Sequence, residues 1–97
     1  MSLTLTLTAL ADDNRLKILE LLKKGELPPQ DIQKKLEITG ATLSHHLDTL
    51  KRADLISGRR DGRQIFYSLN LSVFESSAEK LIKFFQIKKS KKVQWRG

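Results

Sequence analysis

Cysteine is absent from this chain of 97 residues, and its absence removes two classes of structure. Without thiols there is no disulfide framework, and no metal site can use thiolate ligands. The sequence also lacks an apolar run long enough to span a membrane. Its N-terminus has no basic region followed by a continuous apolar core, which is the pattern of an export signal. We therefore expect a cytoplasmic protein that has no membrane partner.

The patterns that indicate an enzyme are missing as well. There is no glycine-rich phosphate loop, and no carboxylate pair or nucleophile with a base stands at recognisable spacing. The two histidines, His45 and His46, are neighbours. On a helix they would point about 100° apart, so they could not bind one metal ion together. The sequence predicts no enzymatic activity, no cofactor and no metal site.

Positive charge is what the chain has in excess. Lysine and arginine outnumber aspartate and glutamate by 18 to 11, which gives a formal net charge of +7. A polyanion is therefore the expected partner, with nucleic acid favoured over a membrane surface. A chain of this length forms one domain with a modest core, so self-association is a further option.

The segment from Ile38 to Leu50 has the pattern of a DNA recognition helix. Thr39 suits the N-cap position, and three leucines behind it form one stripe at helical spacing. The opposite side is short and polar, which suits contact with base edges in the major groove. The residues predicted to face the bases are Ala41, Thr42, His45, Thr49 and Arg52. Asp48 lies on the same side, where it could accept from cytosine or repel the backbone.

Two helices are predicted before this one. Asp12 is a plausible N-cap for a core helix that ends at Gly25. The apolar stripe of that helix consists of Leu16, Leu19 and Leu22, with Ile18 alongside. Arg15, on its first turn, is expected to have a structural role rather than to contact DNA.

The next helix opens with two prolines, and residues 28–53 then form a helix-turn-helix in which Ile32 and Leu36 face inward. Lys34 and Lys35 lie where a first helix crosses the phosphate backbone, but a merely solvated face is an equally good interpretation.

A hairpin is expected over residues 55–69. Asp61 and Gly62 form a strong two-residue turn signal, and apolar residues alternate after it. The basic residues near the tip are Arg59, Arg60 and Arg63. Arginines at a hairpin tip are often only solubilising, but directly after a helix-turn-helix we favour contact with phosphates or a narrow minor groove.

The last helix is predicted to start at a capping box formed by Ser72 and Glu75. Its apolar stripe consists of Phe74, Ala78, Leu81, Ile82 and Phe85. Little remains for this stripe to cover inside one subunit, so we expect it to pack against a second copy of the chain. The lysine run that follows has no apolar periodicity. We therefore divide the chain into a domain over residues 1–88 and a basic tail over residues 89–97, interpreted as frayed rather than as an additional phosphate contact.

The recognition segment also resembles a known family. Ser44, His46, Leu47 and Leu50 match the Ser-x-His-Leu-x-x-Leu signature of the ArsR family of winged-helix repressors. The stretch Leu10-Ala-Asp-Asp-Asn-Arg-Leu-Lys-Ile-Leu19 is similar to the family's Leu-x-Asp-Pro-Thr-Arg-x-x-Ile-Leu opening, although Asp-Asn replaces the usual Pro-Thr. Residues 53–69 resemble its wing, so the likeness covers residues 10–69.

This resemblance implies a mainly α fold with a small β-hairpin, a winged helix-turn-helix that dimerises through its first and last helices. It adds Ser44 to the base-facing residues. It also makes a helix of residues 3–10, where alternating leucine and threonine favour a strand while helical spacing is satisfied too. The leucines that this helix would bring to the dimer interface are Leu3, Leu7 and Leu10.

Members of the family that sense metals carry a Cys-x-Cys pair or ligands on the last helix, and this sequence has neither set. We therefore predict a homodimeric repressor that binds double-stranded DNA at a palindromic operator and does not respond to metal ions. The sequence identifies no effector. Two other functions fit the same pattern, namely a winged-helix module that docks a protein and a basic domain with only non-specific affinity for nucleic acid. The basic hairpin argues against the first, because interface cores are depleted of charge.

Overall fold

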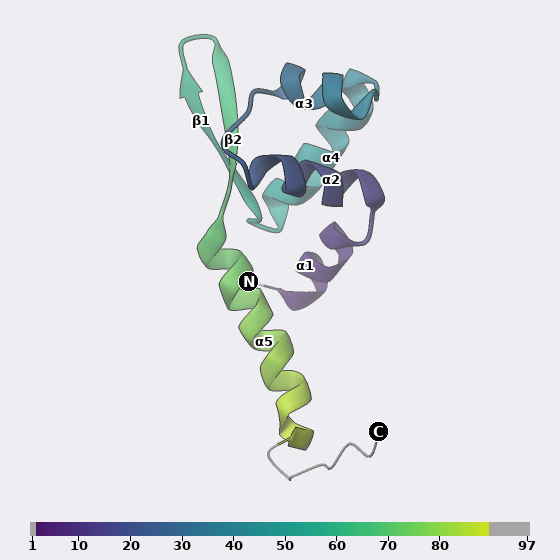
Figure 1. Ribbon diagram of the computed structural model, residues 1–97, viewed down its shortest axis with the longest axis vertical. Helices are drawn as coiled ribbons and strands as arrows, with labels where there is room; N and C mark the ends of the chain where they lie inside the picture. The colour runs from purple at the N-terminus through teal and green to yellow at the C-terminus, as the bar shows by residue number, and fades with distance from the viewer. Residues whose placement is uncertain (1, 90–97) are drawn as a thin grey trace.

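The computed structural model describes residues 2–89, and the side chains of residues 2–86. Figure 1 shows a body of short helices, a hairpin that projects from it, and a long last helix that extends away from the opposite end. In chain order the elements are α1 (Leu3–Leu10), α2 (Asp13–Leu22), α3 (Pro29–Leu36), α4 (Gly40–Arg52), β1 (Ile56–Asp61), β2 (Gln64–Leu69) and α5 (Leu71–Lys89). Apart from Lys89, the predicted basic tail lies outside the described residues.

The core lies between α2, α3, α4 and the base of the hairpin. Ile18, Ile32, Leu50 and Leu55 are fully buried there, and each such side chain stabilises the fold by roughly 1.5–3 kcal/mol. Within the predicted stripe of α2, the expectation for Leu16 is wrong because 47% of this residue is exposed. The buried side of α2 is centred on Ile18 and Leu22, and Leu16 lies beside that face.

Residues 3–10 form a helix rather than a strand, as the family resemblance implies. Ser2 caps α1 by accepting a hydrogen bond from the Leu5 amide at 3.2 Å. Thr6 is buried, and its hydroxyl donates a hydrogen bond to the Ser2 carbonyl. One of the threonines whose alternation with leucine favours a strand is therefore satisfied within the helix. Thr6 and Ala9 therefore face the body, while Leu5 and Leu7 are exposed.

The helix-turn-helix consists of α3, a short turn and α4. Pro29 occupies the first turn of α3, where its missing amide costs no helical hydrogen bond. Glu37 then adopts a left-handed conformation with φ of 56°, which ends α3 and reverses the chain. Thr39 caps α4 as predicted, since its hydroxyl oxygen accepts from the Thr42 amide at 3.1 Å.

The hairpin pairs Ile56 with Leu69 at its base and Asp61 with Gln64 at its tip. Its loop is therefore Gly62 and Arg63, one residue later than the predicted Asp61 and Gly62. Gly62 has φ of +65° at the first loop position, a conformation that glycine adopts without steric cost and Asp61 would not. Hereafter this hairpin, β1 and β2 with their loop, is called the wing.

The last helix starts at Leu71, and the predicted cap at Ser72 is wrong. The Asn70 carbonyl accepts from the amides of Val73 and Phe74, while the Ser72 hydroxyl contacts the side chain of Asn70 at 3.2 Å. Within residues 71–86 of α5, Val73 and Ser77 are buried. None of the described helices is both long and apolar enough to cross a membrane.

Candidate DNA-binding surface

The outer face of α4 carries all six residues predicted to contact bases. Leu43, His46, Leu47 and Leu50 are buried and fix the opposite face against the body. Five of these outer residues are exposed, namely Ala41, Thr42, Ser44, His45 and Arg52. The sixth, Thr49, is half-buried. The structure therefore places these residues on one accessible surface of the second helix of the helix-turn-helix.

These side chains differ in how many of their hydrogen-bond donors and acceptors are already paired within the described residues. The Thr49 hydroxyl donates to the His45 carbonyl at 3.0 Å, so only its oxygen lone pairs remain available. Arg52 is held by Asp48 at 2.8 Å, although both side chains are largely exposed. His45 has no side-chain hydrogen bond among the described residues, and its ring contacts only that of His46. The His45 imidazole and the Ser44 hydroxyl are therefore the side-chain groups on this face that have no hydrogen bond to any described residue.

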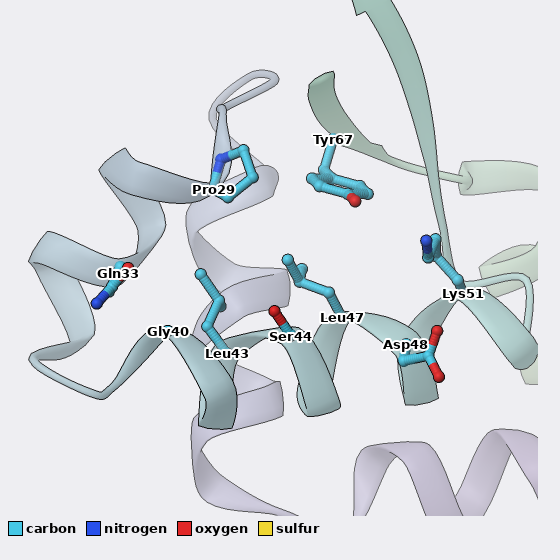
Figure 2. Close-up of a pocket in the computed structure, with 9 residues that line it drawn as sticks. All are labelled: Pro29, Gln33, Gly40, Leu43, Ser44, Leu47, Asp48, Lys51 and Tyr67. Carbon is cyan, nitrogen blue, oxygen red and sulfur yellow. The ribbon is translucent and has the colours of Figure 1, made fainter. Parts of the chain in front are cut away.

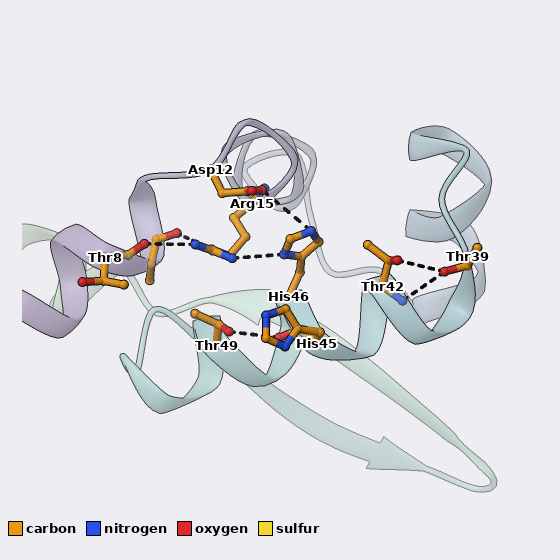
Figure 3. A network of polar contacts seen from close by, with 9 residues as sticks. Thr8, Asp12, Arg15, Thr39, Thr42, His45, His46 and Thr49 are labelled. Carbon is orange, nitrogen blue, oxygen red and sulfur yellow. Dashed lines mark hydrogen bonds and ion pairs between the residues drawn. The ribbon is translucent and has the colours of Figure 1, made fainter.

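Behind this face, a polar network holds α4 against α2 (Figure 3). Arg15 Nη1 lies 3.1 Å from His46 Nδ1, and the Asp12 carboxylate lies 3.7 Å from His46 Nε2. Because a guanidinium can only donate, His46 Nδ1 must accept, which describes a neutral imidazole. Burial lowers the pKa of His46, and the attraction of Asp12 only partly opposes this. His46 is thus a structural residue that links α4 to α2.

The same arginine ties α1 to this network. Arg15 Nε donates to the Ala9 carbonyl at 2.7 Å, and Arg15 Nη2 donates to the Thr8 carbonyl at 3.0 Å. These carbonyls belong to the last turn of α1, where a cation is also favoured by the helix dipole. Asp12 in turn caps α2 through the Arg15 amide, which lowers the pKa of the Asp12 carboxyl. One side chain therefore joins α1, α2 and α4, in agreement with its expected structural role.

The three arginines of the wing are not equivalent. Arg59 donates from Nε to Glu26 at 3.2 Å, lies 3.8 Å from Asp61, and covers the ring of Phe66 at 5.2 Å from its centroid. The hydrogen bonds from Arg59 lower the pKa of the Glu26 carboxyl. Arg59 is therefore engaged in fastening the wing to the segment before α3, a role that the sequence did not reveal because Glu26 is distant along the chain.

Arg60 and Arg63 are free by comparison. Both are exposed, and within residues 2–86 neither forms a hydrogen bond or an ion pair. Arg63 belongs to the loop, and Arg60 stands on β1 opposite Ile65. These two guanidiniums are the wing's available contacts for a polyanion.

Three lysines complete the surface. Lys34 and Lys35 are exposed in the last turn of α3, where positive charge is favoured by the helix dipole, so the structure leaves both interpretations of this pair open. Lys51, which no pattern in the sequence singles out, lies with its ammonium 5.8 Å from the centroid of the Tyr67 ring. Its position between α4 and the wing follows from the hairpin packing, which the sequence pattern does not give.

The residues predicted to form a dimer interface lie on α1 and α5. The half-buried ones are Leu3, Leu10, Phe74 and Leu81, and the exposed ones are Leu7, Ala78, Ile82 and Phe85. Phe84, which the prediction left out, is 64% exposed and stacks edge-on against Phe85. Among the described residues, no group of three His, Asp or Glu side chains is arranged to hold a metal ion.

Comparison with known proteins agrees with this architecture. The helix-turn-helix domain family matches residues 10–59. The transcriptional repressor SdpR of Bacillus subtilis is 42% identical over 76 residues, which are 78% of this chain and 84% of that protein. The arsenical resistance operon repressor of Staphylococcus aureus is 35% identical over 81% of this chain and 76% of that protein.

A solved structure gives the same result. The homodimeric winged helix-turn-helix DNA-binding domain of a possible ArsR-family regulator from Mycobacterium bovis superimposes with a TM-score of 0.70 at 27% identity. The alignment covers 90% of this chain and 82% of that domain. The matching relatives, the signature on α4 and the wing all point to one family. The chain belongs to the ArsR family of winged helix-turn-helix transcriptional regulators.

Proposed function

We propose that this protein is a homodimeric repressor that binds a palindromic operator and blocks transcription by occupying it. The observation that carries the proposal is the accessible polar face of α4, fixed on the second helix of a helix-turn-helix beside a wing with two arginines that pair with none of the described residues. In this arrangement α4 reads base edges in the major groove, and Arg60 and Arg63 contact phosphates or the adjacent minor groove. The B. subtilis relative, named as a transcriptional repressor, supports the direction of control.

Dimerisation is supported by the apolar surface that one subunit leaves uncovered. Ile82, Phe84 and Phe85 are 53%, 64% and 66% exposed, and Leu7 is exposed on the neighbouring α1. Isolated exposed apolar residues are ordinary, but large ones gathered on one helix indicate an interface. In a symmetric dimer the two α4 helices would meet half-sites about 34 Å apart, one turn of DNA, or a multiple of it.

Release of the operator is proposed not to depend on metal ions. The S. aureus relative is named for arsenical resistance, but this chain has no cysteine and its described residues hold no cluster of metal-ligating side chains. Stoichiometric Zn(II), Cd(II) or As(III) should therefore leave operator affinity unchanged in a titration. A tenfold weakening by any of these ions would contradict this part of the proposal.

Selection of bound sequences from a random pool of duplex DNA by the full chain tests the proposal as a whole. We expect an inverted repeat with the half-site spacing given above. Enrichment without any preferred sequence would indicate a non-specific nucleic-acid-binding domain instead. Absence of DNA binding at low salt would point to the protein-docking alternative.

A further inference from the structure

A groove separates α4 from the wing, and its walls have a chemistry that the proposed function does not yet use. It has a volume of about 320 Å³ and is enclosed by α3, α4 and β2. Figure 2 shows Leu43 and Leu47 projecting from α4 toward Pro29 and the ring of Tyr67, which together form an apolar floor. The polar residues along its edge are Gln33, Ser44, Asp48 and Lys51.

Hydrogen-bond donors at this groove are unused. Within the described residues, Lys51 and Ser44 have no side-chain hydrogen bond or ion pair, and the Tyr67 hydroxyl has no partner. No fully buried polar side-chain atom of these residues lacks a partner, so the Tyr67 hydroxyl must reach solvent. Asp48 is the one acid of the lining, and its carboxylate is held by Arg52 at 2.8 Å. The groove therefore offers an ammonium and two hydroxyls to an anionic group.

The position of the groove identifies the anion. In the proposed complex α4 occupies the major groove of DNA and the wing reaches the neighbouring minor groove. The sugar-phosphate strand that divides these two grooves must then pass between α4 and the wing. We propose that this groove seats that strand, with Lys51 as the main phosphate contact and the Tyr67 hydroxyl as a second one. This inference rests on the proposed function and extends it to residues that neither the recognition face nor the wing tip includes.

A small-molecule ligand fits these walls less well. Binding pockets for small molecules bury most of their ligand, whereas Ser44, Asp48 and Lys51 stand exposed along the edge. A linear polyanion, by contrast, needs only a shallow track lined with donors. Tyr67 is also held in place for this role. An added Cβ at Gly58 would lie 3.1 Å from the Tyr67 ring, so glycine at that position lets the ring pack directly against β1.

The test compares Lys51→Gln with Lys17→Gln, which removes the same charge from an exposed site on α2. Affinity is measured on the selected operator and on random duplex DNA over a series of salt concentrations. Lys51→Gln should weaken binding to both DNAs and reduce the slope of log affinity against log salt by about 0.9 for each phosphate that is no longer neutralised. Lys17→Gln should leave both quantities unchanged. Lys51→Arg should restore the slope. Tyr67→Phe should weaken binding to both DNAs but leave the slope of log affinity against log salt unchanged, because it removes no charge.

Several outcomes would overturn the inference while leaving the proposed function intact. The inference would be refuted if Lys51→Gln left the slope of log affinity against log salt unchanged on an operator that the unmodified chain binds. A loss confined to the operator would assign Lys51 to a base instead of a phosphate. Thermal unfolding of each variant shows whether its fold is preserved, and Lys51→Arg keeps the test valid if glutamine disturbs the Tyr67 contact. Failure of the unmodified chain to bind DNA at all would instead refute the proposed function.

Discussion

The half of the molecule that we propose faces DNA and the half formed by α1 and α5 differ in which of their side chains the chain itself buries. The leucines of α4 are buried by the chain's own α2, α3 and wing, and its polar face is left to solvent. On α5 this relation is reversed, because among its residues 71–86 only Val73 and Ser77 are buried, and Phe84 and Phe85 are exposed. One half therefore buries its apolar side chains within the subunit and exposes a polar surface, and the other exposes an apolar surface that none of the described residues covers.

This difference indicates what each half requires. The recognition surface needs only its own subunit for its geometry, so changes to its outer residues should alter binding without altering stability. In the proposed dimer the α5 surface packs against a second subunit, so changes there should act on assembly first and on DNA binding as a consequence. Arg15 and His46 lie at the junction, where α1 contacts α4.

The largest expected effect comes from Ile82→Glu. A charge at this exposed apolar position of α5 should dissociate the dimer, and operator affinity should fall by about 10²- to 10⁴-fold because the two half-sites are no longer bound together. Lys83→Glu is the control, since it places the same side chain about 100° away around the helix. Sedimentation at micromolar concentration measures assembly. A folded monomer for the unmodified chain would contradict the dimer assignment.

The next effect concerns the outer face of α4. His45→Ala or Thr42→Ala should cost on the order of 1–3 kcal/mol on the preferred site and relax the preference at one base pair of each half-site. Affinity for random DNA should barely change, and the free energy of unfolding should stay within about 0.5 kcal/mol of the unmodified value. Titration on both DNAs with parallel denaturation measures this. Equal losses on the two DNAs would remove the base-reading assignment.

A smaller effect should distinguish the arginines of the wing. Arg60→Gln should weaken binding to operator and random DNA alike and lower the salt slope by about 0.9 for each phosphate that Arg60 neutralises. Arg59→Gln removes the same charge, but Arg59 is already engaged with Glu26, so its direct effect on the slope should be smaller. Titrations at several salt concentrations compare the two. The assignment of roles would be reversed if Arg59→Gln lowered the slope more than Arg60→Gln.

The smallest effect is a pH dependence at the junction between the halves. Burial lowers the pKa of His46 in the folded chain, so the unfolded state binds a proton first as pH falls through about 6.5. The free energy of unfolding should therefore decrease below this pH and be unaffected by His46 above it. The pKa of Asp12 is also lowered in the folded chain, so Asp12 causes a separate decrease in the free energy of unfolding below its unfolded pKa of 3.8.

His46→Gln isolates the histidine contribution, since a glutamine oxygen can still accept from Arg15. In this variant the free energy of unfolding should not decrease as the pH falls below about 6.5. In His45→Gln, which removes an exposed imidazole, the decrease should remain. Chemical denaturation between pH 7 and pH 5 measures the difference. Identical pH dependence in the two variants would show that His46 is not the group responsible.

Local patterns predicted the elements whose signals lie within one segment. The cap at Thr39, the leucine stripe of α4 and the prolines of α3 each depend on neighbours within two turns, and the structure confirms them. The first helix was settled by the family resemblance, because the sequence pattern of residues 3–10 alone favours a strand. Leu16 and Ser72 were assigned wrongly because helical spacing and a capping pattern do not fix which face is buried or which residue begins the helix.

Long-range contacts were beyond the reach of sequence patterns. The pairing of Arg59 with Glu26 joins residues 33 positions apart, and that of Arg15 with His46 joins residues 31 positions apart. Neither pair forms a recognisable motif along the chain. The position of Lys51 beside Tyr67 likewise depends on how the wing packs on α4. Which residues contact DNA stays a prediction that the experiments above can decide.

The uncovered aromatic end of α5 has a consequence for how such a repressor responds to its own abundance. When a subunit binds its operator only as half of a dimer, the amount of competent protein follows mass action between chains. At concentrations below the dimer dissociation constant, doubling the number of chains would nearly quadruple the number of dimers. Phe84 and Phe85, far from any base, would thus set the expression level at which the operator becomes occupied and make that transition steeper than a monomer could.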